Sequence, residues 1–144
     1  MAYLLDTDAI SETLRRRPLT AYITWLATIP SDQLFTSSVS IAELLRGAYK
    51  SRDRYPNLLT RIESQIIPTL TILSFDLSIA KVYARIGGSL EQQGQVLAHP
   101  DLQIAATALH FELQLVTGNL RHFSRITDLI INSVLADAKA SQGQ

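Results

Sequence analysis

Short apolar segments alternate with helical patterns along the whole chain, and this alternation constrains the fold more than any other feature. The apolar segments that we interpret as strands are residues 3–5, 34–37, 70–73, 115–117 and 129–131. Between them, apolar residues recur at helical spacing, as at Ile41, Leu44, Leu45 and Ala48. Strands separated by helices pair in parallel, because a parallel connection needs a long crossover. The sequence therefore predicts an α/β fold with three layers, α/β/α, around a central, mainly parallel sheet.

The predicted elements have recognisable ends. Pro18 closes the first helical stretch, Asp76 is a predicted N-cap, and Gly94 suits the end of the long helix that follows it. No repeat or linker interrupts the pattern, so we expect residues 1–135 to form a single domain. The small and polar residues 136–144 are expected to be a frayed C-terminal tail.

The composition is that of an ordinary globular protein and excludes several classes. The chain has 144 residues, of which 47% are hydrophobic and 18% charged, enough to bury a core. It has no cysteine, so disulfides and thiolate metal sites are excluded. No apolar run approaches the roughly 18 residues that cross a membrane, and no signal peptide is visible, so we expect a cytoplasmic protein. With 13 basic and 13 acidic residues, the net charge argues against coating nucleic acid by bulk charge.

Three acidic residues and an amide stand at matching places in this pattern. Asp6 ends the first strand, and Glu43 lies in the first turn of the helix after the second strand. Asp101 opens the helix before the fourth strand, and Asn119 follows that strand. In a parallel sheet, the C-terminal ends of the strands and the N-termini of the returning helices share one edge. Oxygen ligands select Mg²⁺ or Mn²⁺ over zinc, so these residues predict a shared cation site that could activate water.

Each of these residues also has a purely structural explanation. Ser40 and Glu43 fit a capping box, and Asp101 after a proline is an ordinary helix opening. Asn119 after a glycine is common turn chemistry, and Asp8 could be the N-cap of the first helix. From spacing alone, the metal site and these explanations both stay open.

Other polar residues near the predicted site are ambiguous. His99 and His122 flank it, but metal-activated water needs no histidine, so neither is included among the site residues. Arginines and lysines cluster at 15–17, 50–54 and 121–125. These clusters are either solvated helix ends or surfaces that face a phosphate backbone.

The sequence resembles the PIN-domain family, in particular the VapC-type ribonuclease toxins of bacterial toxin–antitoxin pairs. Four blocks carry the resemblance in the family's order and spacing, and they are Leu4–Asp8, Ser38–Leu44, Pro100–Ala106 and Val116–Phe123. The similarity extends from Tyr3 to Ile131. It implies a PIN-like α/β/α fold and a Mg²⁺- or Mn²⁺-dependent endoribonuclease that hydrolyses RNA phosphodiesters.

The resemblance also implies site residues and partners. The family's acidic catalytic and metal-binding positions carry over to Asp6, Glu43 and Asp101, and the fourth position is Asn119. Similar toxins form homodimers and are inhibited by a cognate antitoxin, which often inserts a basic side chain into the acidic pocket. The groove for it would involve the helices around residues 10–29 and 41–49.

Two positions depart from the family's pattern. Asp8 is commonly an asparagine in relatives, so this chain carries an additional negative charge. The fourth position is often an aspartate, whereas Asn119 is neutral. The missing charge at Asn119 affects a second metal site more than the first, so we expect one well-held cation.

Two other functions fit parts of the sequence. The first is a PIN-like binding module without catalysis, which the neutral fourth position would favour. The second is a haloacid-dehalogenase-like phosphatase with Asp6 as nucleophile, since the first strand ends in Asp6-Thr7-Asp8. That enzyme also needs a lysine and a late pair of acids, and the late segment offers only Asn119 and a solitary Asp128. No segment reads bases by a known code, so the sequence does not name the RNA that is cut.

Overall fold

A five-stranded sheet forms the centre of the molecule in the computed structural model, which describes residues 1–142. Its strands are β1 (Tyr3–Leu5), β2 (Leu34–Ser37), β3 (Thr71–Leu73), β4 (Gln114–Val116) and β5 (Ile131–Asn132). They lie in the order β3-β2-β1-β4-β5, and every neighbouring pair is parallel. The predicted parallel sheet is confirmed, and β1 lies at its centre.

Helices lie on both sides of the sheet, between the strands and after β5. They are α1 (Thr7–Leu14), α2 (Thr20–Ala27), α3 (Ser38–Lys50), α4 (Leu58–Arg61), α5 (Leu77–Gln92), α6 (His99–His110), α7 (Leu120–Phe123) and α8 (Val134–Gln142). Asp76 caps α5 by accepting the backbone N–H of Ile79 at 3.1 Å, as predicted. Gly94 follows α5 with a φ of 70°, a conformation that glycine adopts readily. Among residues 1–142, no helix is long and apolar enough to cross a membrane.

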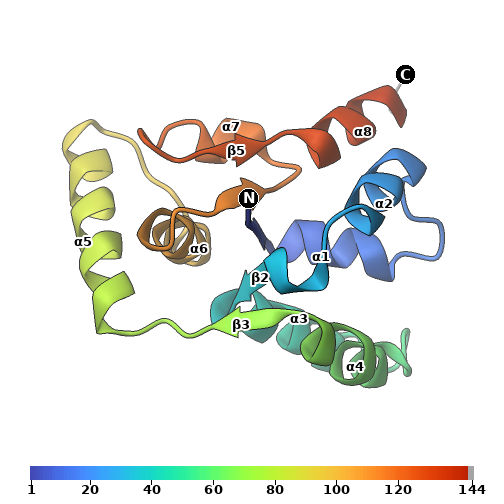
Figure 1. Ribbon diagram of the computed structural model, residues 1–144. Coiled ribbons are helices and arrows are strands. Elements are labelled where there is room, and N and C mark those ends of the chain that lie inside the picture. The colour runs from blue at the N-terminus through green and yellow to red at the C-terminus, as the bar shows by residue number, and fades with distance from the viewer. Residues whose placement is uncertain (143–144) are drawn as a thin grey trace.

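Two apolar clusters, one on each face of the sheet, create the three layers. Successive strand residues point to opposite faces, so Leu4 packs into the cluster with α5 and α6, whereas Leu5 packs into the cluster with α1, α2 and α3. Leu115 and Val116 of β4 divide in the same way. Figure 1 shows α5 and α6 on one side and α1, α2, α3 and α4 on the other. The predicted α/β/α architecture is confirmed.

The C-terminal segment differs from the prediction. Residues 134–142 form α8, so the expected frayed tail is wrong for this segment, and residues 143–144 lie outside the described part. Leu135 is fully buried and Ala138 nearly so, and α8 packs beside α2. Leu135 and Ala138 stand among small and polar residues, so the segment has only a weak helical pattern. The packing of α8 against α2 stabilises the helix.

Candidate active site

Asp6 lies at the end of β1 and is the N-cap of α1. Its Oδ1 accepts the backbone N–H of Ala9 at 2.7 Å, so Asp8 lies in the first turn of the helix and is not its cap. The side chain of Asp6 is buried, and this burial raises its pKa from 3.8 to about 7. Hydrogen bonds from Thr117 and Ala9 oppose the rise, while the charges of Asp8 and Asp101 add to it. Asp6 is therefore a buried acid with other acids nearby.

Glu43 reaches the same edge from α3. Ser37 is the N-cap of α3 and accepts the N–H of Val39 at 3.0 Å, so the capping box between Ser40 and Glu43 is wrong. Instead, Oε1 of Glu43 accepts the hydroxyl of Thr7 at 2.6 Å. Because Thr7 directly follows Asp6, this hydrogen bond joins α3 to the end of β1.

Asp101 and Asn119 meet at His122. Asp101 lies in the first turn of α6, and its Oδ2 is 3.6 Å from Nδ1 of His122. The side-chain amide nitrogen of Asn119 lies 2.8 Å from the same Nδ1. Burial raises the pKa of Asp101, the charge of Glu43 raises it further, and His122 lowers it. The set of predicted site residues did not include His122, although its position three residues after Asn119 on a short helix could have indicated it.

The carboxylates at this edge do not form a ready metal cage. Within residues 1–142, no three histidine or acidic side chains are arranged so that they could hold an ion. Glu43 and Asp101 instead face Thr7 and His122. The donors nevertheless suit a hard divalent cation, since they offer oxygens, and a buried Asp6 among like charges is an arrangement that a cation would stabilise. The structure thus gathers the predicted residues at one edge, and their role as metal ligands stays a prediction.

Comparison with known proteins identifies this site's family. Residues 3–129 match the family described as PIN domain. The chain belongs to the PIN domain family. Ribonuclease VapC1 of Haemophilus influenzae (strain R2866) is 33% identical over 129 residues, which cover 90% of this chain and 95% of that protein. Toxin FitB of Neisseria gonorrhoeae (strain ATCC 700825 / FA 1090) is 35% identical over 124 residues, with coverages of 83% and 89%.

A solved structure has the same fold as this PIN domain. It is the crystal structure of VapBC2 from Rickettsia felis bound to a DNA fragment from the promoter, with a TM-score of 0.82 and 28% identity. The match covers 92% of this chain and 98% of that one. Within the family, the chain is a VapC/FitB-type toxin ribonuclease, so the predicted resemblance is confirmed. The haloacid-dehalogenase-like interpretation is wrong.

A groove of about 1050 Å³ leads away from the acidic edge of the PIN domain. It begins at Thr7 and Glu43 and lies between α1, α3 and the segment that leads into α4. Five arginines line it, at positions 15, 16, 17, 54 and 61. Arg61 donates to the backbone carbonyl of Leu14 at 3.0 Å, and Arg15 pairs with the buried Glu12. The groove therefore presents positive charge directly beside the acids.

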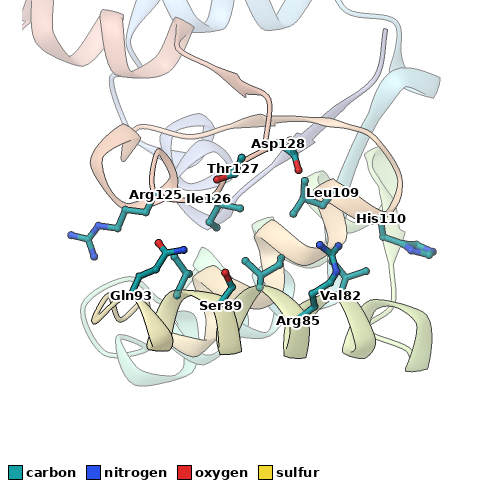
Figure 2. A pocket seen from close by; sticks show the side chains of 12 residues that line it. Val82, Arg85, Ser89, Gln93, Leu109, His110, Arg125, Ile126, Thr127 and Asp128 are labelled. Atoms are coloured by element: carbon teal, nitrogen blue, oxygen red, sulfur yellow. The ribbon is translucent and has the colours of Figure 1, made fainter.

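Another pocket of the PIN domain lies away from these acids. It has a volume of about 380 Å³ and lies between α5 and the segment after α7. Figure 2 shows the side chains of Arg125 and His110 directed outward at its two ends. None of the four predicted site residues lines it. This pocket is therefore separate from the candidate active site.

Proposed function

We propose that this PIN domain is the metal-dependent endoribonuclease toxin of a toxin–antitoxin pair and hydrolyses RNA phosphodiesters. The observation that carries the proposal is the meeting of Asp6, Glu43, Asp101 and Asn119 from four separate segments at one edge of the sheet. Burial and neighbouring acids there raise the pKa of Asp6 to about 7, an environment that favours a bound cation. Relatives that bear the name VapC ribonuclease support the same reaction class.

Some residues at this edge would bind the metal ion, and others would position the residues that bind it. When bound, Mg²⁺ or Mn²⁺ supplies an activated water and offsets the charge of the phosphodiester. Asp6 and Asp101, together with Glu43 and Asn119, would hold the ion. The strand beneath Asp6 and the hydrogen bond from Ala9 fix that carboxylate in place. Thr7 and His122 would keep the other acids at the edge, since they already contact Glu43 and Asp101.

The arginine-lined groove would bind both the RNA substrate and the antitoxin. Arginines bind the phosphate backbone of RNA without reading its sequence, so the groove suits an RNA strand that reaches the acids from one side. A cognate antitoxin would compete for the same place and insert a basic side chain among the carboxylates. The solved VapBC2 and FitAcB complexes of relatives support an antitoxin partner. We expect the chain to act in the cytoplasm as a homodimer.

Chelation and substitution test this proposal directly. Pure protein is incubated with total RNA and Mn²⁺, with and without EDTA, and cleavage is followed over time. Wild type should cut only without EDTA, and Asp6→Asn or Asp101→Asn should lower the rate at least about 100-fold, because each removes a carboxylate that would hold the metal. The matched control is Asp32→Asn, which makes the same chemical change at an exposed residue and should cut like wild type.

The outcomes separate the alternatives. If wild type does not cut RNA with Mn²⁺, a PIN-like binding module without catalysis is favoured. Cleavage that persists in EDTA would contradict the metal dependence. If Asp6→Asn folds and cuts at the wild-type rate, Asp6 is not a metal ligand. Circular dichroism of each variant checks that the fold is intact.

A further inference from the structure

An ion pair ties the C-terminal helix to the acidic edge. Nζ of Lys139 on α8 donates to both carboxylate oxygens of Asp8, at 2.8 and 2.7 Å. Asp8 lies two residues after Asp6, whereas Lys139 is 131 residues further along the chain. The buried Leu135 and Ala138 hold α8 in place, so the ammonium group is delivered by a packed helix.

The absence of a side chain at Gly118 leaves room for this ion pair. A Cβ atom on Gly118 would clash with Oδ2 of Asp8 and would lie 2.8 Å from Nζ of Lys139. Gly118 is part of the turn after β4, between Thr117 and Asn119, and the N–H of Asn119 bonds to the hydroxyl of Thr117 at 3.0 Å. The ion pair therefore contacts the same turn that positions Asn119 of the candidate site.

The charges at this edge show what the ion pair does. Four carboxylates are present, those of Asp6, Asp8, Glu43 and Asp101, and the ammonium of Lys139 leaves three negative charges when all are ionised. One divalent cation would reduce these to a single negative charge. Without the ammonium, the sum would again be four negative charges, and both oxygens of Asp8 would be free beside Asp6. That is a place where a second divalent cation could bind.

We propose that Lys139 is a positioning residue that stands in for a second cation, binding Asp8 and keeping it out of the metal site, so that each chain holds one divalent ion. This inference rests on the proposed metal-dependent function. The two positions that depart from the family's pattern agree with it, since Asp8 is bound by a lysine and Asn119 is neutral.

Titration of the metal-free full-length protein with Mn²⁺ tests the inference without measuring cleavage. Calorimetry gives the number of ions bound per chain and their dissociation constants. Wild type should bind one ion. Lys139→Met keeps the apolar stem but removes the charge, and it should bind a second ion or bind the first about tenfold more tightly. The double variant Asp8→Asn with Lys139→Met should return to wild-type behaviour, and the control Lys81→Met, at an exposed lysine on α5, should not differ from wild type.

The number of bound ions and their affinities distinguish a failure of this inference from a failure of the proposed function. If Lys139→Met binds Mn²⁺ with wild-type number and affinity, the inference is overturned while the proposed function stands. Two ions on wild type overturn it as well, and no ion on wild type overturns both the inference and the proposed metal dependence. If circular dichroism shows that Lys139→Met has lost helix, Lys139→Gln is used instead, because it also removes the charge and keeps a polar end at that position of α8. The same gain in Mn²⁺ binding is then expected, and its absence overturns the inference.

Discussion

Keeping the buried Asp6 side chain ionised destabilises the folded protein. The pKa of Asp6 is about 7 in the folded protein, compared with 3.8 for an aspartate that is exposed to water, as in the unfolded chain. The folded chain thus holds this proton more tightly than the unfolded chain does, so the unfolded state loses its proton first as the pH rises. The resulting contribution to stability is present at low pH and is lost between about pH 4 and pH 7 in metal-free protein. For a side chain as buried as Asp6, the loss is up to about 4 kcal/mol.

Asp6→Asn should therefore stabilise the metal-free protein in a pH-dependent way. Asparagine caps a helix as well as aspartate does, so the substitution keeps the hydrogen bond from Ala9 and removes only the charge. In EDTA, urea unfolding should show a gain of about 2 to 4 kcal/mol at about pH 8 and almost none at about pH 4. Asp32→Asn is the exposed control, without such a gain. An equal gain at both pH values would contradict the burial argument.

Strand polarity explains why the sequence could place the site residues and could not describe their contacts. The ends of β1 and β4 and the start of α6 share one edge, so the positions of Asp6, Asp101 and Asn119 follow from the order of the elements. The contacts of Glu43 with Thr7 and of Asp8 with Lys139 depend on which way side chains point between segments far apart in the chain. Spacing holds no information about that direction.

At the scale of elements, helices with a full apolar stripe were predictable and α8 was not. The stripe in α3 announces its buried face, and Ile41, Leu44 and Ala48 are indeed buried. In α8, only Leu135 and Ala138 are buried, and two apolar residues spaced three apart do not distinguish a helix from a frayed tail. Tertiary contacts stabilise this helix, namely the packing against α2 and the ion pair between Lys139 and Asp8.

Leu135→Ala should reveal how much α8 contributes to the fold. Leu135 is fully buried among the side chains of the cluster that holds Leu5 and Ile10, so its truncation leaves a cavity and should cost about 2 to 4 kcal/mol in urea unfolding. The matched control is Leu77→Ala, because Leu77 is 71% exposed and its truncation should change stability by less than about 0.5 kcal/mol. Equal effects of the two variants would mean that α8 is not part of the cooperative fold.

At the scale of the whole molecule, the sheet joins segments from both ends of the chain into one acidic edge. Asp6 lies near the N-terminus, and Lys139, near the C-terminus, binds Asp8 two residues after it. An ion bound at this edge would contact only the folded chain, since the unfolded chain separates these segments. Binding and folding are then linked, and Mn²⁺ at about 100 times its dissociation constant should stabilise the protein by roughly 2.7 kcal/mol.

The same linkage predicts how Mn²⁺ binding depends on pH. A cation binds the ionised carboxylate, and Asp6 keeps its proton below about pH 7, so binding must release that proton. The Mn²⁺ affinity should fall about tenfold for each pH unit below 7 and change little above about pH 8. Calorimetry at about pH 6 in two buffers of different ionisation enthalpy should detect about one proton released per ion. Asp32→Asn should keep this profile, whereas an affinity independent of pH would show that the ion does not bind Asp6.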